Sequence, residues 1–416
     1  MRNERMLVRA LGVEGAIVER VHWTSGEEGM GLEVQVRVRR KDERRCPHCQ
    51  RRCGRYDRGS GRRHWRAPDA GLCRVQVAAD APRVKCPEHG VVVAGVPWAR
   101  PGARFTRAFE DLVGWLAVRT DKTTLSSLFG IAWRSVGRIL ERVAEDQKKK
   151  VSPLANVTRI GIDEVSYRKG HRYLTLVVDH DSGRLLFATP GKDEAALERF
   201  FDELGEKGCA RLEFASVDAG AAYNNVVRRR CPQATVCLDP FHVVQWATQA
   251  LDTVRRQVWN ELRKSGETAR AKQLKGARWA LWKNPGSLRE DQQRTLAELE
   301  RDNQKLYRAY LLKEELRIVF HEPDARLAKL TLKDWLSWAS RSRLPPFVKL
   351  ARTIRAHRQA IHDVLDHGLS NARLEAAATK LRLLTRLAFG FHSAEPLIAL
   401  AKLRLGGLAP PLPRSA

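Results

Sequence analysis

The stretch RIGIDEVSYRKGHRYLTLVVDHDSGRLLFAT, residues 159–189, decides the fold. Its three β-branched or apolar runs are joined by the short segments Arg-Lys-Gly-His and Asp-Ser-Gly, which predicts an antiparallel three-strand meander. Beyond it, segments that fit helices and strands alternate: a helix over 193–208, a strand over 211–218, a helix over 221–231, a strand over 234–239 and a long helix from about 241. This order predicts a mixed sheet with helices on its faces.

Carboxylates follow the strands of this predicted sheet, in a chain whose formal net charge is +27. Asp163, Asp218 and Asp239 each end one strand. A single Asp at such a place is commonly a turn residue or a helix cap, but strand ends in one sheet converge on one site. Clustered carboxylates repel each other unless a divalent cation lies between them, and hard oxygen ligands suit Mg²⁺ or Mn²⁺. We therefore expect a two-cation centre for phosphodiester cleavage. Glu164 points to the opposite face of its strand and is expected to be structural.

A helical segment near the C-terminus, SNARLEAAATKLRLLTRLAFG over residues 370–390, carries a further acid. At 3.6 residues per turn, Glu375 shares one face with Arg382 and Arg386. An acid in line with two arginines can bind a metal ion while the arginines, together with Lys380, hold DNA phosphates. A charge network within the helix is the alternative.

Two short turns near the N-terminus contain metal-binding residue types: CPHC, with Cys46 and Cys49, and CPEH, with Cys86 and His89. A tetrahedral zinc site needs four such ligands, and two-residue spacing places each pair on a tight turn. Buried thiols beside a surface histidine are one alternative, and replacement of one ligand by Cys53 is another. Such a small module has little core, so we expect zinc to hold it together.

The segment TTLSSLFGIAWRSVGRILERV, residues 123–143, fits a helix-turn-helix. Thr123 or Thr124 is expected to cap the first helix, and Gly130 to make the turn. Arg134 and Arg138 then lie on an exposed face of the second helix, where we expect Arg134 to read a base and Arg138 to contact a phosphate. Helical hairpins are common, so this motif alone does not establish DNA binding.

The charge of the chain predicts a polyanionic partner, because 75 Lys and Arg residues face 48 Asp and Glu residues. Between Arg37 and Arg66, thirteen basic residues face three acidic ones, and we assign Arg62 and Arg63 in this segment to DNA binding. A solvated basic surface is the alternative. The first residues lack the apolar region of a signal peptide, and no stretch approaches the roughly 18 apolar residues of a membrane span. We expect a cytoplasmic protein without a membrane partner.

Together these residues resemble the bacterial insertion-sequence transposases that have an RNase H-like DDE catalytic domain, and within them the group with an N-terminal zinc ribbon and a helix-turn-helix. The resemblance covers nearly the whole chain and rests on CPHC with CPEHG, DKTTLSSLFGIAWRSVGRI, IGIDEVSYRKGHRYLTLVVDHDSGRLL, LDPFHVVQWATQALDTVRRQ and SNARLEAAATKLRLLTRLAFGFHSAEPLIAL. It implies that Asp163, Asp218 and Glu375 are the three catalytic acids, which hold two Mg²⁺ or Mn²⁺ ions. It also implies that Asp239 and His242 form an Asp-x-x-His element, whose His positions the DNA end. Position 378 is Ala here, whereas the family often has Asn three residues after the Glu.

The same resemblance implies a multidomain chain of α+β and α/β parts. We expect a β-rich lead-in and zinc ribbon, a helix-turn-helix domain, the first part of an RNase H-like core, an α-helical insertion, the Glu-bearing part of the core and a flexible tail, over residues 1–100, 101–150, 151–265, 266–360, 361–405 and 406–416. Tryptophans of the insertion suit core packing at least as well as base stacking or the pairing of two DNA ends: Trp279, Trp282, Trp335 and Trp338.

As a transposase, the protein is expected to bind the terminal inverted repeats of its element, cleave DNA with water as the nucleophile and transfer the new 3′ hydroxyl to target DNA. Its expected partners are double-stranded DNA and further copies of the chain, as a homodimer or a higher oligomer on paired ends, with no small-molecule substrate. The expected location is the bacterial cytoplasm, in association with the nucleoid. Two alternatives are an inactive zinc and helix-turn-helix regulator of the same architecture and an RNase H-like nuclease without end specificity.

Overall fold

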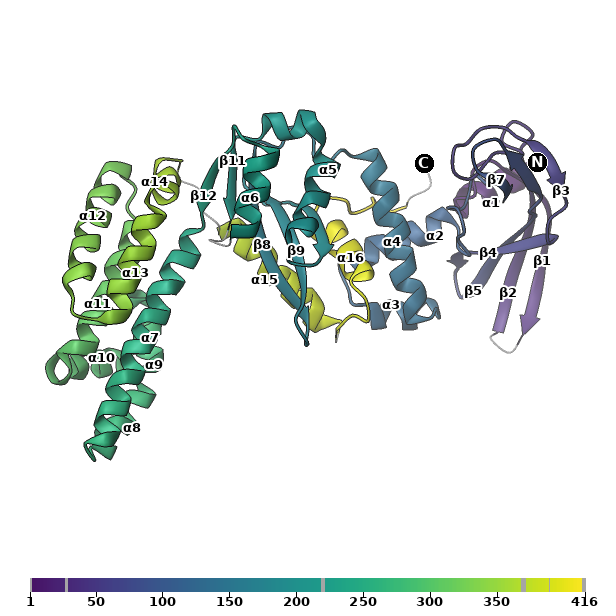
Figure 1. The fold of residues 1–416 in the computed structure, drawn as a ribbon. Coiled ribbons are helices and arrows are strands. Elements are labelled where there is room, and N and C mark those ends of the chain that lie inside the picture. The colour runs from purple at the N-terminus through teal and green to yellow at the C-terminus, as the bar shows by residue number, and fades with distance from the viewer. Residues whose placement is uncertain (1, 27–28, 218–220, 368–371, 389, 414–416) are drawn as a thin grey trace. The chain divides into compact units, whose positions relative to one another are not determined.

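The structure is a computed structural model that describes residues 2–26, 29–217, 221–367, 372–388 and 390–413 (Figure 1). It divides into two compact units, one of residues 1–153 with 381–416 and one of residues 154–380. The multidomain α/β fold class predicted from the sequence is confirmed. No helix in the described ranges is long and apolar enough to cross a membrane.

The first unit begins with a helix and a four-stranded sheet. The elements are α1 (Arg2–Ala10), β1 (Ala16–Gly26), β2 (Gly29–Val38), β4 (Arg62–Ala70) and β5 (Cys73–Asp80), in the sheet order β1-β2-β5-β4. Residues 2–10, at the start of the expected β-rich lead-in, form a helix that the sequence did not indicate. The helix forms because Leu7, Val8 and Leu11 lie three and four residues apart and pack on the sheet core around Val34 and Trp65.

A second, three-stranded sheet carries the cysteine-rich segment. It consists of β3 (Gly54–Asp57), β6 (Arg83–Cys86) and β7 (Gly90–Val93), in the order β3-β6-β7. Its small core contains Cys46, Cys53, Val84 and Cys86. A core of this size buries little apolar surface, so the segment depends on additional bonds for its stability.

Four helices complete the first unit: α2 (Arg107–Ala117), α3 (Lys122–Phe129), α4 (Trp133–Lys150) and α16 (Glu395–Leu405), which packs on α4. Gly130 ends α3 in the left-handed region, at φ 58°, as a tight turn requires. The predicted Thr cap is wrong, because the carboxylate of Asp121 accepts hydrogen bonds from the backbone N–H groups of Thr123 and Thr124 at 2.8 and 2.9 Å.

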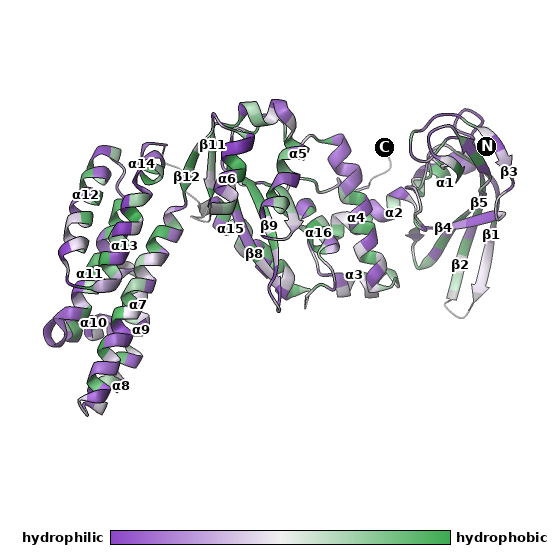
Figure 2. Ribbon diagram, in the orientation of Figure 1, coloured by the Kyte–Doolittle hydropathy of each residue, from purple (hydrophilic) through white to green (hydrophobic). Residues whose placement is uncertain are grey.

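The second unit is built on a five-stranded mixed sheet. Its elements are β8 (Arg159–Arg168), β9 (Arg172–Asp179), β10 (Leu185–Pro190), α5 (Glu194–Arg211), β11 (Phe214–Val217), α6 (Ala221–Arg230), β12 (Thr235–Leu238) and α7 (Pro240–Lys264). The order across the sheet is β10-β9-β8-β11-β12, with the first three strands antiparallel and β11 parallel to both β8 and β12. This confirms the predicted order of strands and helices. The hydropathy colouring shows the apolar character of these strands (Figure 2).

An α-helical bundle follows along α7. It contains α8 (Thr268–Gly276), α9 (Arg278–Trp282), a 3₁₀ turn at Pro285–Ser287, α10 (Glu290–Asp302), α11 (Gln304–Val319), α12 (Ala325–Arg341) and α13 (Pro345–Ala356). The chain then returns to the sheet through α14 (Arg358–His367), which packs on β12, and α15 (Ala372–Leu387).

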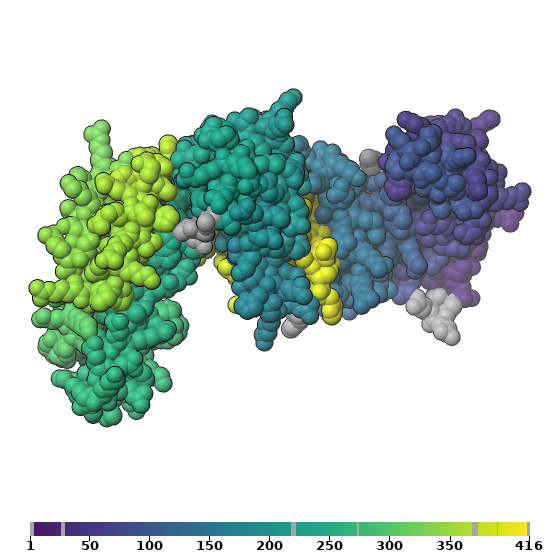
Figure 3. Space-filling model, in the orientation of Figure 1, coloured from purple at the N-terminus to yellow at the C-terminus, as the bar shows by residue number. Residues whose placement is uncertain are grey.

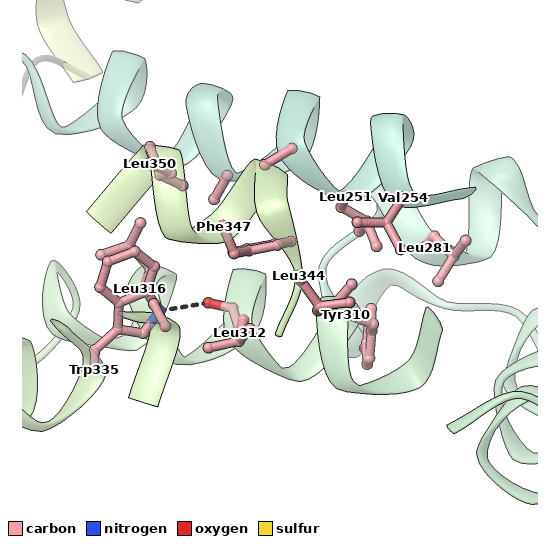
Figure 4. Close-up of a cluster of buried hydrophobic side chains, with 14 of the residues drawn as sticks. Leu251, Val254, Leu281, Tyr310, Leu312, Leu316, Trp335, Leu344, Phe347 and Leu350 are labelled. Carbon is pink, nitrogen blue, oxygen red and sulfur yellow. Dashed lines mark hydrogen bonds between the residues drawn. The ribbon is translucent and has the colours of Figure 1, made fainter. Parts of the chain in front are cut away.

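The bundle has a continuous apolar core (Figure 4). Trp335 is 1% exposed, and its indole N–H donates a hydrogen bond to the backbone oxygen of Leu312 at 2.7 Å. Trp279, by contrast, is 59% exposed. The tryptophans of the insertion therefore divide, with Trp335 a core residue and Trp279 a surface residue.

Candidate active site and metal centre

Asp163 lies within β8, whereas the sequence analysis predicted that it ends the strand. The strand continues to Arg168 because β9 pairs with it along its length, from Ile160 opposite Asp179 to Arg168 opposite Arg172. The parallel strand β11 pairs with β8 only as far as Gly161. Asp163 therefore lies just past the parallel part of the sheet and is half-buried. One of its carboxylate oxygens accepts a hydrogen bond from the N–H of Glu164 at 2.7 Å.

Asp239 lies where β11 and β12 end together. Val217 pairs with Leu238, the last residue of β12, and the N–H of Asp239 donates to the backbone oxygen of Val217 at 3.1 Å. Asp218 follows Val217 directly in the sequence and lies outside the described residues. The topology thus brings the chain positions of Asp163 and Asp239 to adjacent parts of the same sheet, with β11 between their strands.

The carboxylate of Asp239 caps α7 and orients His242. One oxygen accepts a hydrogen bond from the N–H of Phe241 at 2.8 Å, and the other lies 2.9 Å from Nδ1 of His242. Asp239 is only 5% exposed. Both oxygens thus have partners within the protein. Asp239 therefore acts as the N-cap of α7, which is a common role for an Asp at the end of a strand, and it also fixes the ring of His242.

Helix α15 lies on the face of the sheet to which Asp163 points. Leu374 is 2% exposed, and a Cβ atom placed on Gly161 would lie 3.0 Å from Leu374 Cδ2. Side chains two residues apart on a strand point to the same face, so Gly161 and Asp163 share one. Glu375 follows Leu374, is exposed and lies in the first turn of the helix that packs on this face through Leu374. Ala378 is 1% exposed, one turn from Leu374 on the packed side of the helix.

Arg373 fixes the start of α15 to the turn between β9 and β10. Its guanidinium donates hydrogen bonds to the backbone oxygens of His180, at 2.6 Å, and Asp181. Its aliphatic carbons pass 3.5–3.7 Å from where a Cβ atom on Gly183 would lie. The hydrogen bond to His180 joins residues 193 positions apart in the chain, and no local pattern in the sequence indicated it.

His180 is a buried polar residue on this face that the sequence did not single out. It is 7% exposed, and its Nε2 lies 2.7 Å from the hydroxyl of Ser216. Burial lowers the pKa of His180, although the carboxylates of Asp181, Asp179 and Asp239 act in the opposite direction. Burial therefore favours the neutral form of the ring. Its sequence signal, a His directly after an apolar strand, is too common to be diagnostic.

The opposite face of the sheet holds a second polar contact. The hydroxyls of Tyr223 and Thr175 lie 2.8 Å apart, and Thr175 also donates to the backbone oxygen of Gly191 at 2.9 Å. Burial raises the pKa of Tyr223 far above its usual value, and the Glu164 carboxylate contributes to the shift. Because Tyr223 belongs to α6, this contact holds the helix that follows Asp218, and it agrees with a structural role for Glu164.

Four predicted ligands come together at the N-terminal metal centre. The ligand atoms of Cys46, Cys49, Cys86 and His89 all lie within 4.8 Å of one another. The thiol of Cys53 lies outside this group and donates to the backbone oxygen of Arg51 at 3.3 Å. The donor set consists of three cysteines and one histidine, two residues from each turn. This set fits tetrahedral zinc.

The residues assigned to DNA binding lie on several elements. Arg134 and Arg138 are exposed on α4, and Lys380, Arg382 and Arg386 are exposed on α15. Two others have partners within the protein: Arg62 lies 3.5 Å from Asp80, and Arg63 lies over the ring of Trp65 and donates to the backbone oxygen of Ala103.

A buried ion cluster joins α2 to α4, the second helix of the helix-turn-helix, and was not predicted. Glu110 on α2 is fully buried and accepts hydrogen bonds from Arg100 and Arg142, while Arg100 also bonds Asp111 and Asp146. Buried charges need such partners, and loss of one partner typically costs about 3–5 kcal/mol. The cluster joins the segment before α2 to α2 and α4.

A zinc-type donor set, a helix-turn-helix and a mixed sheet of this topology in one chain define the class of DNA transposases with an RNase H-like domain. Comparison with known families agrees with this class: one family model described as a transposase, of the ISL3 type with a DDE domain, matches residues 160–401. A model of the helix-turn-helix domain of transposase family ISL3 matches residues 96–144, and a model of the zinc finger of the IS204/IS1001/IS1096/IS1165 transposases matches residues 42–89.

Individual relatives lead to the same group. The chain is 49% identical, over 99% of its length and 98% of the relative's, to the transposase for insertion sequence element IS1557 from two strains of Mycobacterium tuberculosis. It is 26% identical, over 94% of its length and 96% of the relative's, to the transposase for insertion sequence element IS1001 from Bordetella parapertussis. The chain belongs to the ISL3 family of transposases.

Proposed function

We propose that this transposase cleaves phosphodiester bonds at the ends of its own insertion sequence and joins the new 3′ hydroxyl to target DNA, with Asp163, Asp218 and Glu375 as its catalytic acids. The observation that carries the proposal is the position of α15. Leu374 lies against Gly161, two residues before Asp163 on β8, and Glu375 is the next residue of the same helix, which supports placing the two acids in one centre.

The donor set supports binding of two divalent cations. Asp163 is half-buried and Glu375 is exposed, so both carboxylates remain accessible from solvent, and hard carboxylate oxygens suit Mg²⁺ or Mn²⁺. The cations would supply the positive charge that activates the attacking hydroxyl and stabilises the leaving oxygen. Asp218 completes the set by its place directly after β11.

The other residues near the site orient these groups. Asp239 fixes the ring of His242, which we assign to positioning the DNA end. Arg373 holds the start of α15, and the contact of Tyr223 with Thr175 holds the start of α6. Displacement of a catalytic group by about 1 Å can lower a rate by about 10²-fold, so these contacts matter for activity although none of them reacts.

We assign DNA recognition to the N-terminal unit. Arg134 lies at the start of α4 and would read a base, while Arg138 one turn later would contact a phosphate. Structural zinc on Cys46, Cys49, Cys86 and His89 would hold the zinc ribbon, with Arg62 and Arg63 beside it. Lys380, Arg382 and Arg386 would hold phosphates near the acids.

We further propose that two or more copies act on paired ends and that the protein works in the bacterial cytoplasm at the nucleoid. Each of the six segments expected from the sequence, from the zinc ribbon to the tail, would serve end recognition, catalysis or DNA contact. The high positive charge of the chain, +27, supports a nucleic-acid partner for the assembly.

The test of the catalytic assignment is Asp163→Asn. Amide for carboxylate keeps the size of the side chain but removes the charge that binds a cation, so cleavage of a DNA fragment with the element's end is expected to be lost while binding to it is retained. Gel shift and cleavage are measured on the same samples. Cleavage by the variant at the wild-type rate would refute the assignment of Asp163 as a catalytic acid.

A further inference from the structure

A groove runs between α7 and α13 in the helical bundle, with a volume of about 570 Å³. Its α7 side is formed by residues one helical turn apart: Trp246, Gln249, Ala250, Thr253 and Gln257. Its α13 side is formed by Pro345, Pro346, Lys349, Leu350 and Thr353. The groove has amide, hydroxyl and ammonium donors along its walls and no acidic side chain among the residues that line it.

The chain around α13 is rich in basic residues: Lys349 lines the groove, and Arg352 and Arg355 lie on the same helix. From Trp335 to His362 the chain has six basic residues and no Asp or Glu: Arg341, Arg343, Lys349, Arg352, Arg355 and Arg358. All six side chains are exposed. α13 reaches the surface on the face that Figure 3 shows, at the yellow-green end of the bundle.

Charge is segregated within the bundle. In the part of the chain that the structure describes, no ion pair with a carboxylate involves any of these six residues, whereas several basic residues on the other helices are paired: Lys305 with Glu261 at 2.8 Å, Arg317 with Glu314 at 2.7 Å and Lys329 with Asp366 at 2.6 Å. Six uncompensated charges repel one another, which costs stability in the protein alone. A polyanion bound along α13 would relieve that repulsion.

α7 connects this groove to the acidic centre. Its first residue follows Asp239, and His242 lies one turn before Trp246 on the same side of the helix. Trp246 in turn lies against the ring of His357, with 6.2 Å between ring centres. One helix face therefore runs from the residue that we assign to the DNA end into the groove.

We propose that the α7–α13 groove is a second DNA-binding surface, which holds the phosphate backbone of the duplex that leads away from the acidic centre. The proposal rests on the proposed function for the position of the cut, but not for the binding itself. At 1.5 Å per residue, Trp246 and Gln257 lie about 10 and 27 Å along α7 from Asp239. For a duplex that lies along α7 with its cut at the acidic centre, 3.4 Å per base pair places the phosphates at the groove about 3 to 8 base pairs from the cut.

The test uses the full-length protein and a duplex that carries the element's end. The variant is Lys349→Ala with Arg352→Ala and Arg355→Ala. The matched control is Arg289→Ala with Arg294→Ala and Lys305→Ala, which removes the same charge from exposed residues of the same bundle that do have carboxylate partners. Binding is measured over a range of salt concentrations, and ethylation interference identifies the phosphates that the protein contacts.

Each lost phosphate contact reduces the slope of log K against log salt by about 0.9, so the α13 variant is expected to lose up to about 2.7 units and the interference about 3 to 8 base pairs from the cut. Contacts of the N-terminal unit are expected to remain. Gln249→Glu, which places a negative charge on the groove wall without touching α13, is expected to weaken the same contacts.

An unchanged slope and interference pattern in the α13 variant would overturn the proposal, and so would an equal loss in the control. Both readouts need no cleavage. If the wild type binds but never cuts DNA, the catalytic proposal fails while the α13 comparison still decides whether the groove binds DNA.

Discussion

Gly161 is the position where the geometry of the acidic centre depends most on a single atom. A Cβ atom there would lie 3.0 Å from Leu374 Cδ2, 3.2 Å from His180 Nε2 and 3.3 Å from Ser216 Oγ. The last two atoms are held together by a hydrogen bond of 2.7 Å in a buried site, so they have little room to move. In Gly161→Ala the strain therefore falls on Leu374, and α15 must shift away from the sheet.

The magnitude follows from overpacking, which typically costs about 1–3 kcal/mol in a well-packed interior. For a unit of this size we expect the thermal transition to fall by about 2–4 °C per kcal/mol. A shift of α15 by a few tenths of an ångström or more also displaces Glu375, and cleavage is expected to fall by about 10- to 100-fold with DNA binding retained. Calorimetry and end cleavage measure the two effects.

The control is Gly276→Ala, where an added Cβ atom meets no neighbour within 4 Å. In the double variant with Leu374→Ala the closest neighbour is removed, so Gly161→Ala is expected to lower cleavage less in the Leu374→Ala background than in the wild type. Wild-type stability and cleavage in Gly161→Ala would refute the idea that α15 is seated on β8 in this way.

Further predictions concern the contacts around the same centre and the metal site. Arg373→Ala is expected to lower cleavage more than end binding, because two hydrogen bonds to the β9–β10 turn are lost. Arg382→Ala is expected instead to weaken end binding. Gel-shift and cleavage assays on the same samples distinguish the two effects. Because the pKa of His180 is lowered in the folded protein, the unfolded chain binds a proton there more readily. The free energy of unfolding is therefore expected to fall as pH drops below about 6.5. Urea titrations of His180→Gln are expected to show a shallower fall. Tyr223→Phe is expected to cost about 1 kcal/mol of unfolding free energy, and a loss below about 0.3 kcal/mol would argue against an anchoring contact. Chelation of zinc, or Cys49→Ser, is expected to unfold the cysteine-rich segment and to weaken end binding, as circular dichroism and gel shift can show; an unchanged spectrum would contradict structural zinc.

The sequence was sufficient for the order of the strands and helices of the five-stranded sheet because each of them has a strong local signal. The meander over 159–189 has apolar runs and short turns, and Gly130 has a left-handed backbone at the predicted turn. The two-residue spacing of the cysteine and histidine turns likewise indicated which four side chains come together.

Tertiary contacts decided the features that the sequence did not predict. β8 runs past Asp163 because β9 supplies a partner as far as Arg168, and residue patterns do not reveal how far two strands pair. Asp121 takes the cap because its carboxylate, one residue before the helix, reaches two N–H groups at once. The contact of Arg373 with the β9–β10 turn joins residues far apart in the chain, so no local pattern contains it.

The central claim is that Glu375 completes an acidic centre that cuts DNA at the ends of the element. The most direct measurement is cleavage of a linear duplex carrying the element's own end, with Mg²⁺ or Mn²⁺, by the wild type and by Glu375→Gln, with end binding measured on the same samples. The account predicts end-specific nicking by the wild type, its loss in the variant and equal binding by both. Equal nicking by both proteins would remove Glu375 from the centre, and specific binding without nicking by either would contradict the catalytic role of the chain.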